Sequence, residues 1–173
     1  MRLPPFSLAR SLVWYDEVVR ELFLRLKFNA DTSVIPGLCQ LISGYDTTEF
    51  KQVDWIVPVP LHRLRLRKRG LNQSLVLARM FFPGHGHLLR TDLLVRTKNS
   101  RAQTLLSGVR RRRNLRGVFR TAKPEEIDGA VVCLVDDVFT TGTTVAECTR
   151  TMLKSGAREV KVLTMARVKV IRG

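Results

Sequence analysis

The segment from Val131 to Val145 constrains the fold of this chain more than any other part of the sequence. It reads Val-Val-Cys-Leu-Val-Asp-Asp-Val-Phe-Thr-Thr-Gly-Thr-Thr-Val. The short apolar run predicts a buried strand, two carboxylates stand at its carboxyl end, and a hydroxyl-rich loop then leads into a helix. Ligands of open α/β sheets bind beyond the carboxyl ends of the strands. The segment therefore predicts an α/β fold with a ligand site at this turn.

The residue types in this turn indicate the chemistry of the ligand. A helix N-terminus presents backbone N–H groups to an anion, and Gly142 lets the backbone approach it closely. Asp136 and Asp137 suit sugar hydroxyls or a hard cation such as Mg²⁺. An ordinary helix cap needs only one such polar residue. We therefore predict a ligand with both a phosphate and a polyol, the phosphate being held by the loop residues Thr140, Thr141, Gly142, Thr143 and Thr144.

The charge of the chain favours an anionic partner. The 173 residues carry a formal net charge of +15, from 30 basic and 15 acidic side chains. Nucleic acid, polyphosphate or an acidic protein surface would all suit this excess, although a charge run often forms only a solvated face. The basic residues gather in two clusters, Arg63, Arg65, Arg67, Lys68 and Arg69, and Arg110, Arg111, Arg112, Arg113, Arg116 and Arg120.

The sequence has no feature that targets it to a membrane. No apolar run approaches the ~20 residues that span a bilayer, and the first residues lack the pattern of a signal peptide. We therefore expect a cytoplasmic protein without membrane insertion. Cys39, Cys133 and Cys148 are far apart and form no metal-binding pair, so we expect them to be small core residues.

Periodicity and turn residues predict alternating helices and strands. A basic loop is expected over residues 61–71, and a long arginine-rich loop over residues 97–117. We expect residues 1–53 to form an N-terminal helical or hood segment and residues 54–173 the main domain, packed as one compact unit. Helices are predicted over residues 15–27, near 34–42, over 75–82 and between the hydroxyl loop and Gly156, and strands over residues 54–60, 93–95, 118–120, 131–135 and 160–166.

The strand, acidic pair and Thr/Gly loop resemble the phosphoribosyl-pyrophosphate (PRPP) signature of type I phosphoribosyltransferases. The resemblance implies the fold of that family, a mostly parallel sheet flanked by helices with a small hood region. It implies that Asp136 and Asp137 hold the ribose hydroxyls, and that residues 140–144 hold the 5′-phosphate. Asp137 is also the candidate catalytic residue, because it could accept a proton. Mg²⁺ is expected to arrive with PRPP, with no metal ligand supplied by the protein itself.

A second motif follows the predicted strand at residues 54–60. Phosphoribosyltransferases place a pyrophosphate-binding loop after a strand of this kind, so Lys68, Arg69 and Gly70 are its candidate residues here. Lysine, arginine and backbone N–H groups suit the charge of a leaving pyrophosphate. Asn72, two residues after Gly70, also suits the cap of the following helix.

A third motif completes a closer resemblance, to the ComF family of competence-associated phosphoribosyltransferase-like proteins. It comprises Arg96, Thr97, Gln103, Leu106, Arg111, Asn114, Gly117 and Phe119. The resemblance runs from about Leu26 to Arg167. It implies a mobile loop that closes over PRPP, with Gln103, Arg111 and Asn114 either contacting substrate or fixing the fold of the loop. ComF proteins commonly begin with a four-cysteine zinc ribbon, which this sequence lacks, so no zinc-dependent role is expected.

Two functions fit these observations. The first is a PRPP-dependent phosphoribosyltransferase, a glycosyltransferase of the pentosyl class, which releases pyrophosphate and is linked to DNA uptake; its acceptor is not identified. The second is a non-catalytic accessory factor for DNA uptake, which binds single-stranded DNA or another polyanion and keeps the phosphate pocket. Aromatic residues are sparse beside the arginine clusters, which weakens base stacking but not phosphate contact. Proteins of the competence machinery are expected partners of either.

Overall fold

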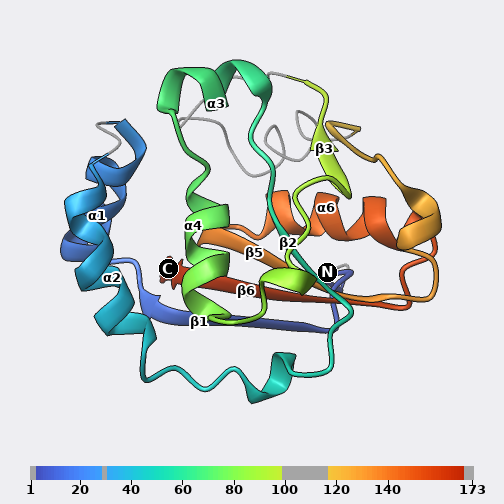
Figure 1. The fold of residues 1–173 in the computed structure, drawn as a ribbon, viewed down its shortest axis with the longest axis horizontal. Helices are drawn as coiled ribbons and strands as arrows, with labels where there is room; N and C mark the ends of the chain where they lie inside the picture. Colours follow the sequence, from blue (N-terminus) through green and yellow to red (C-terminus); the bar gives the residue numbers. More distant parts are fainter. Residues whose placement is uncertain (1–2, 29–30, 99–116, 170–173) are drawn as a thin grey trace.

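A parallel four-stranded sheet forms the centre of the computed structural model, which describes residues 3–28, 31–98 and 117–169 (Figure 1). The strand order is β1–β6–β5–β2, and every neighbouring pair is parallel. The strands span Leu8–Trp14 (β1), Trp55–Pro58 (β2), Val131–Phe139 (β5) and Glu159–Arg167 (β6). This is an α/β architecture of the type I phosphoribosyltransferase kind, and it confirms the predicted fold class.

Helices and a small hairpin cover the two faces of the sheet. Successive strand side chains point to opposite faces, so Cys133 and Val135 belong to one core cluster while Val132 and Leu134 belong to another. The first cluster includes side chains of α1 (Glu17–Phe28), α2 (Ile35–Ile42) and α4 (Gln73–Phe81). The second includes side chains of α6 (Thr143–Lys154) and of the antiparallel pair β3 (Leu94–Arg96) and β4 (Phe119–Thr121).

Short 3₁₀ helices connect these elements. They span Thr32–Val34 (η1), Thr48–Phe50 (η2), Gly86–Leu88 (η3) and Pro124–Glu126 (η4). None of the described helices is both long and apolar enough to cross a membrane.

The basic segment expected to be a loop contains a helix. This helix, α3, spans Arg63–Arg69 and stands at the top of the molecule in Figure 1. His62 caps its start, since its Nδ1 accepts from the N–H of Leu64 at 3.3 Å. Gly70 ends it with a φ of 74°, a left-handed conformation that favours glycine. Arginine, lysine and leucine are strong helix formers, and this preference outweighs the repulsion among the like charges.

Three further details differ from the sequence analysis. Strand β1 was not predicted; it lies at an edge of the sheet and is defined by its pairing with β6. Strand β5 continues to Phe139, so Asp136 and Asp137 lie within it rather than after it. Cys133 and Cys148 are buried as expected, and burial raises the pKa of both thiols. Cys39 is exposed, which corrects its assignment to the core.

Candidate functional site at the carboxyl end of β5

The predicted ligand turn lies where the carboxyl ends of β5 and β2 meet the first turns of α4 and α6. Asp136 stands opposite Thr164 of β6 in the register of the sheet. The neighbouring strand β2 ends at Pro58, and Val59 continues beside β5, with its N–H donating to the carbonyl of Val135 at 2.9 Å. The site is therefore built on the central strand and on the elements that follow β2.

Asp136 is fixed as a hydrogen-bond acceptor. The hydroxyl of Ser74, in the first turn of α4, donates to Asp136 Oδ1 at 3.0 Å, and the N–H of Asp137 donates to the same oxygen at 2.9 Å. Asp137 in turn accepts at Oδ1 from the N–H of Val138 at 2.7 Å. Both carboxylates are half-buried. Acceptors held in this way suit a ligand that brings hydroxyl donors.

The hydroxyl loop joins β5 to α6 through a left-handed glycine. Gly142 has a φ of 68°, and a Cβ at this position would lie 2.5 Å from Cζ of Phe139. Thr141 and Thr143 share a hydrogen bond between their hydroxyls at 2.7 Å. The N-cap residue of α6 is Gly142, which has no side chain to bond to the first N–H groups of the helix. The first N–H groups of this helix therefore suit an anionic ligand.

Phe139 supports this loop, a role that the sequence did not reveal. The ring of Phe6, from the N-terminal segment, meets it edge-on with 6.0 Å between centroids. The guanidinium of Arg167, at the end of β6, lies 4.8 Å from the Phe139 centroid. The loop thus rests on an aromatic side chain that is itself held by two distant parts of the chain.

An arginine cluster lies beside Asp136. Arg96, at the end of β3, is half-buried and lies 5.5 Å from the ring centroid of Phe119. Burial lowers its pKa, and Arg65 and Arg69 of α3 lower it further, whereas Asp136 raises it. Burial and the charge of Arg69 likewise lower the pKa of Arg65. Arg96 is thus close enough to Arg65, Arg69 and Asp136 for their charges to act on it. A group of guanidinium side chains of this kind favours binding of a polyvalent anion.

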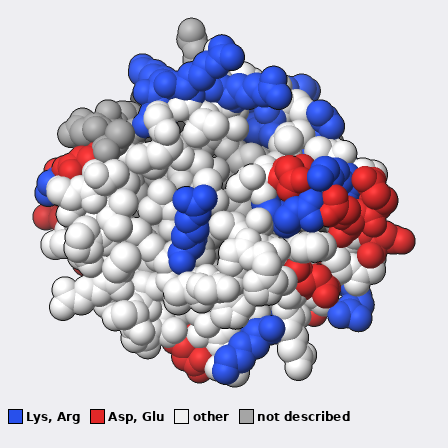
Figure 2. Space-filling view, viewed as in Figure 1, with Lys and Arg blue, Asp and Glu red and all other residues white. Residues whose placement is uncertain are grey.

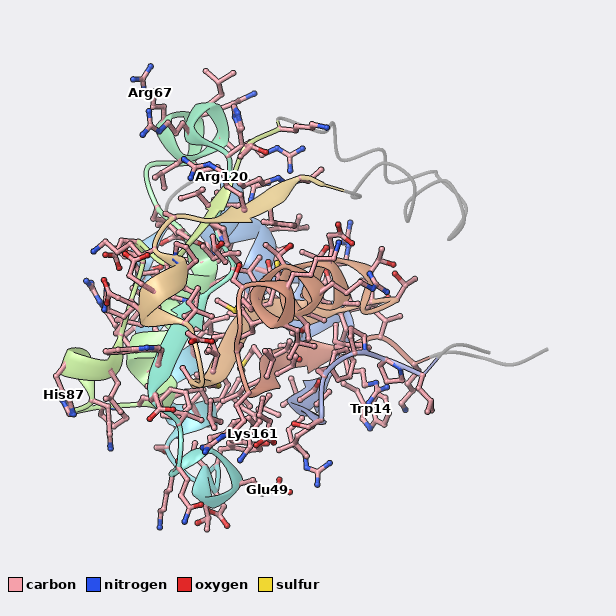
Figure 3. The ribbon with its side chains drawn as sticks, turned by 90° about the vertical axis from the view of Figure 1, so that its right-hand side faces the viewer. Trp14, Glu49, Arg67, His87, Arg120 and Lys161 are labelled. Atoms are coloured by element: carbon pink, nitrogen blue, oxygen red, sulfur yellow. The ribbon has the colours of Figure 1, made fainter. Side chains whose placement is uncertain are left out.

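The residues predicted for the pyrophosphate loop separate in the structure. Arg69 is half-buried and belongs to the arginine cluster, whereas Lys68 is exposed at the end of α3. Gly70 serves as the cap of that helix. Basic side chains gather over α3 along one side of the molecule (Figure 2). Arg67 of α3 and Arg120 of β4 lie at this same end (Figure 3).

Known proteins resemble the chain over almost its whole length. No protein-family model matches the sequence. The chain is 32% identical to the DNA utilization protein YhgH of Escherichia coli K12 over 169 residues, which cover 95% of this chain and 74% of that protein. It is 31% identical to competence protein F of Haemophilus influenzae over 159 residues, covering 88% of this chain and 69% of that protein. The chain belongs to the ComF-type competence protein family.

A third ComF-type relative is more distant. Competence protein ComFC of Bacillus subtilis is 29% identical over 161 residues, which cover 91% of this chain and 63% of that protein. The matches confirm the family that the three sequence motifs indicated.

The loop that the ComF resemblance assigned to PRPP closure falls mostly outside the described residues. Gln103, Arg111 and Asn114 lie there, as does most of the second arginine cluster, residues 110–113 and Arg116. The flanks of this segment are described. Thr97 donates through its N–H to the carbonyl of Val118 at 2.8 Å, and the N–H of Gly117 donates to Glu147 of α6 at 2.9 Å.

Two other features of the described chain bear on the position of the candidate site. In the described part of the chain, no three His, Cys, Asp or Glu side chains are grouped to hold a metal ion. A groove of about 460 Å³ lies between α4 and residues 82–91, beside Ile56 of β2. It includes neither carboxylate of the acidic pair nor any residue of the hydroxyl loop. The groove is therefore separate from the candidate site.

Proposed function

We propose that this chain binds Mg-PRPP at the carboxyl end of β5 and transfers its phosphoribosyl group to an acceptor. The observation that carries the proposal is the arrangement of three groups at one strand end. The acceptor oxygens of Asp136 and Asp137 suit the ribose diol. The N-terminus of α6, which Gly142 precedes, suits the 5′-phosphate. The arginine cluster suits the pyrophosphate.

These groups suit a reaction that separates charge. The bond from the anomeric carbon to pyrophosphate breaks, its electron pair leaves with the pyrophosphate, and positive charge develops on the ribose ring. An acceptor lone pair then bonds to that carbon, and the acceptor loses a proton. Arg65, Arg69 and Arg96 would stabilise the leaving group, whose charge the Mg²⁺ of the substrate partly neutralises. Asp137 is the candidate acceptor for the proton.

The biological setting of the proposal comes from the relatives. They are named as DNA utilization and competence proteins. We infer that this chain acts in the cytoplasm in DNA uptake, together with other proteins of the competence machinery. The identity of the phosphoribosyl acceptor does not follow from the described residues.

Isothermal titration with Mg-PRPP tests the proposal. The double variant Asp136→Asn with Asp137→Asn should bind with a free energy weaker by about 1–3 kcal/mol, because charge-assisted hydrogen bonds to the ribose are lost. Asp46→Asn is a matched control, since Asp46 lies between α2 and η2, and its carboxylate accepts from the N–H and the hydroxyl of Thr48. Equal affinities of the double variant and the wild type would refute the ribose-binding role.

The basic helix favours a second candidate function. Five of the seven residues of α3 are arginine or lysine, and the side chains of Arg63, Arg67 and Lys68 are exposed. We propose as the alternative a non-catalytic accessory factor that binds the phosphates of single-stranded DNA through this helix. The helix contains no aromatic residue for base stacking, so such binding would depend on charge.

A further inference from the structure

The turn that joins α3 to α4 is closed into a ring of hydrogen bonds with the ends of β2 and β5. The side-chain N–H of Asn72 donates to the carbonyl of Val59 at 3.2 Å, and Val59 donates in turn to the carbonyl of Val135 at 2.9 Å. Asp136, the next residue, accepts from the Ser74 hydroxyl at 3.0 Å. The N–H of Ser74 donates back to Asn72 Oδ1 at 3.1 Å. The ring therefore ties one carboxylate of the site to the start of α4.

The burial of this turn is unusual for the start of a helix. Serine in a first turn commonly bonds to nearby backbone, whereas Ser74 is only 5% exposed and its hydroxyl reaches a residue 62 positions away. The adjacent Gln73 is 2% exposed, and its Nε2 has no hydrogen-bond partner among the described residues. An unsatisfied buried donor lowers the stability of the fold. A turn that carries such a cost is not optimised for stability alone.

We propose that Ser74 is a positioning residue that holds the carboxylate of Asp136 in the orientation that receives the ribose diol. The terminal torsion of an aspartate is broad and weakly restrained. Two donors on Oδ1, the Ser74 hydroxyl and the Asp137 N–H, fix the carboxylate plane. The Asn72 bond to Val59 keeps Ser74 at the strand end. This inference rests on the proposed PRPP site and deepens it.

A positioning role differs in its effects from simple support of the helix. If Ser74 only stabilised helix α4, its loss would weaken the binding of every ligand of the site. Loss of the Asp136 orientation would weaken chiefly ligands that present a diol, because the arginine residues proposed to hold pyrophosphate belong to α3 and β3. The effect of losing Ser74 would also depend on the carboxylate that it holds.

The test compares two ligands, ribose 5-phosphate and magnesium pyrophosphate, by isothermal titration. Ser74→Ala should weaken ribose 5-phosphate binding by about 3- to 10-fold, the usual effect of one hydrogen bond, and leave pyrophosphate binding unchanged. Ser74→Thr, which keeps the hydroxyl, should restore the affinity. In an Asp136→Ala background, which has no side-chain acceptor for the Ser74 hydroxyl, Ser74→Ala should have no further effect. Ser155→Ala is the control, because Ser155 shares a 2.8 Å hydrogen bond with Thr121 away from the site.

A second measurement requires no ligand. The amide of Asp137 bonds to the same oxygen as Ser74, so its NMR resonance should shift in Ser74→Ala and return in Ser74→Thr. If the wild type binds neither ligand, the PRPP proposal fails, and the Asp137 amide still decides the role of Ser74. An unmoved Asp137 resonance, or equal losses for both ligands, would overturn the positioning role.

Discussion

Phe139 and Gly142 are in direct contact, so the loop of the candidate phosphate site lies on an aromatic ring. The nearest ring atoms would be 2.5–3.2 Å from a Cβ at position 142, closer than side-chain atoms approach one another. The backbone there is also left-handed, with a φ of 68°. Both the space and the conformation at this position therefore require glycine.

Gly142→Ala should consequently displace the loop. Part of the cost is conformational, about 1–2 kcal/mol for a left-handed alanine, and the rest is the collision with Phe139. Gly129→Ala is the matched control, since Gly129 has a φ of 72° and open space around its Cβ position. Both variants should melt at lower temperature, but only Gly142→Ala should lose ribose 5-phosphate affinity, by about tenfold or more. If both variants bound ribose 5-phosphate with equal affinity, the loop around Gly142 would have no part in phosphate binding.

Arg96→Lys should weaken binding of magnesium pyrophosphate by about 1–3 kcal/mol. Lysine keeps the charge but loses the planar, multidentate donor set of the guanidinium and its contact with Phe119. Arg79→Lys is the control, because Arg79 lies on α4 at the separate groove. Titration calorimetry measures both. If Arg96→Lys lost no more affinity for magnesium pyrophosphate than Arg79→Lys, Arg96 would not bind the leaving group.

Serine in place of Arg63, Arg67 and Lys68 should reduce the salt dependence of single-stranded DNA binding. Each phosphate contact contributes a slope of about −0.7 in log K against log salt, so removing these exposed charges should flatten the plot. Fluorescence anisotropy with a labelled oligonucleotide at several salt concentrations measures the slope. The Asp136→Asn variant serves as a comparison that should leave the slope unchanged. If the slope of log K against log salt were unchanged in the triple variant, the exposed charges of α3 would not contact DNA and would only be solvated.

Acid should weaken an ion-pair network that joins the segment before β3 to η4 and the residue that precedes it. Arg90 pairs with Asp92 at 2.9 Å and with Glu126, and Lys123 pairs with Asp92 at 2.6 Å. Hydrogen bonds from Arg90, foremost, and from Lys123 hold the pKa of Asp92 well below its usual range. A carboxyl group whose pKa is lowered by folding stabilises the fold above its unfolded pKa, about 3.9, and loses this contribution as the pH falls further.

The ion-pair network is partly exposed to solvent, so its contribution to the free energy of unfolding is modest. Asp92→Asn should lower the free energy of unfolding at pH 6 by no more than about 1 kcal/mol, and the difference from the wild type should shrink below about pH 4. Denaturant unfolding at a series of pH values measures this. Glu21→Gln, on an exposed part of α1, should show no such trend. A difference for Asp92→Asn that stays constant down to pH 3 would contradict the assigned cause.

The sequence predicts those parts of the site whose residues lie close together along the chain. The strand, acidic pair, hydroxyl loop and helix around Asp136 follow one another within 15 residues, and the cap role of Asn72 is also local. Ser74 was not predictable, because it reaches Asp136 only through the packing of α4 on β5. Arg96 appeared only as a motif residue, since its place beside Arg65 depends on how β3 lies against α3.

Two elements of the fold were missed for related reasons. The density of arginine suggested a loop where helix propensity produces α3. Strand β1 has a half-exposed side-chain pattern without clear alternation. Its pairing with β6 joins residues about 150 positions apart, such as Leu8 and Lys161, and this long-range pairing leaves no local signal in the sequence.

A titration of the ¹⁵N-labelled protein with Mg-PRPP, followed by NMR, would show which residues the ligand contacts. With the ligand at the carboxyl end of β5, the first and largest amide shifts should occur from Asp136 to Thr144, at Ser74 and at Arg96, while the amides of Arg79 and His85 at the separate groove should not shift. Shifts centred on that groove, shifts confined to the exposed residues of α3, or no shifts at saturating Mg-PRPP would contradict this position of the ligand.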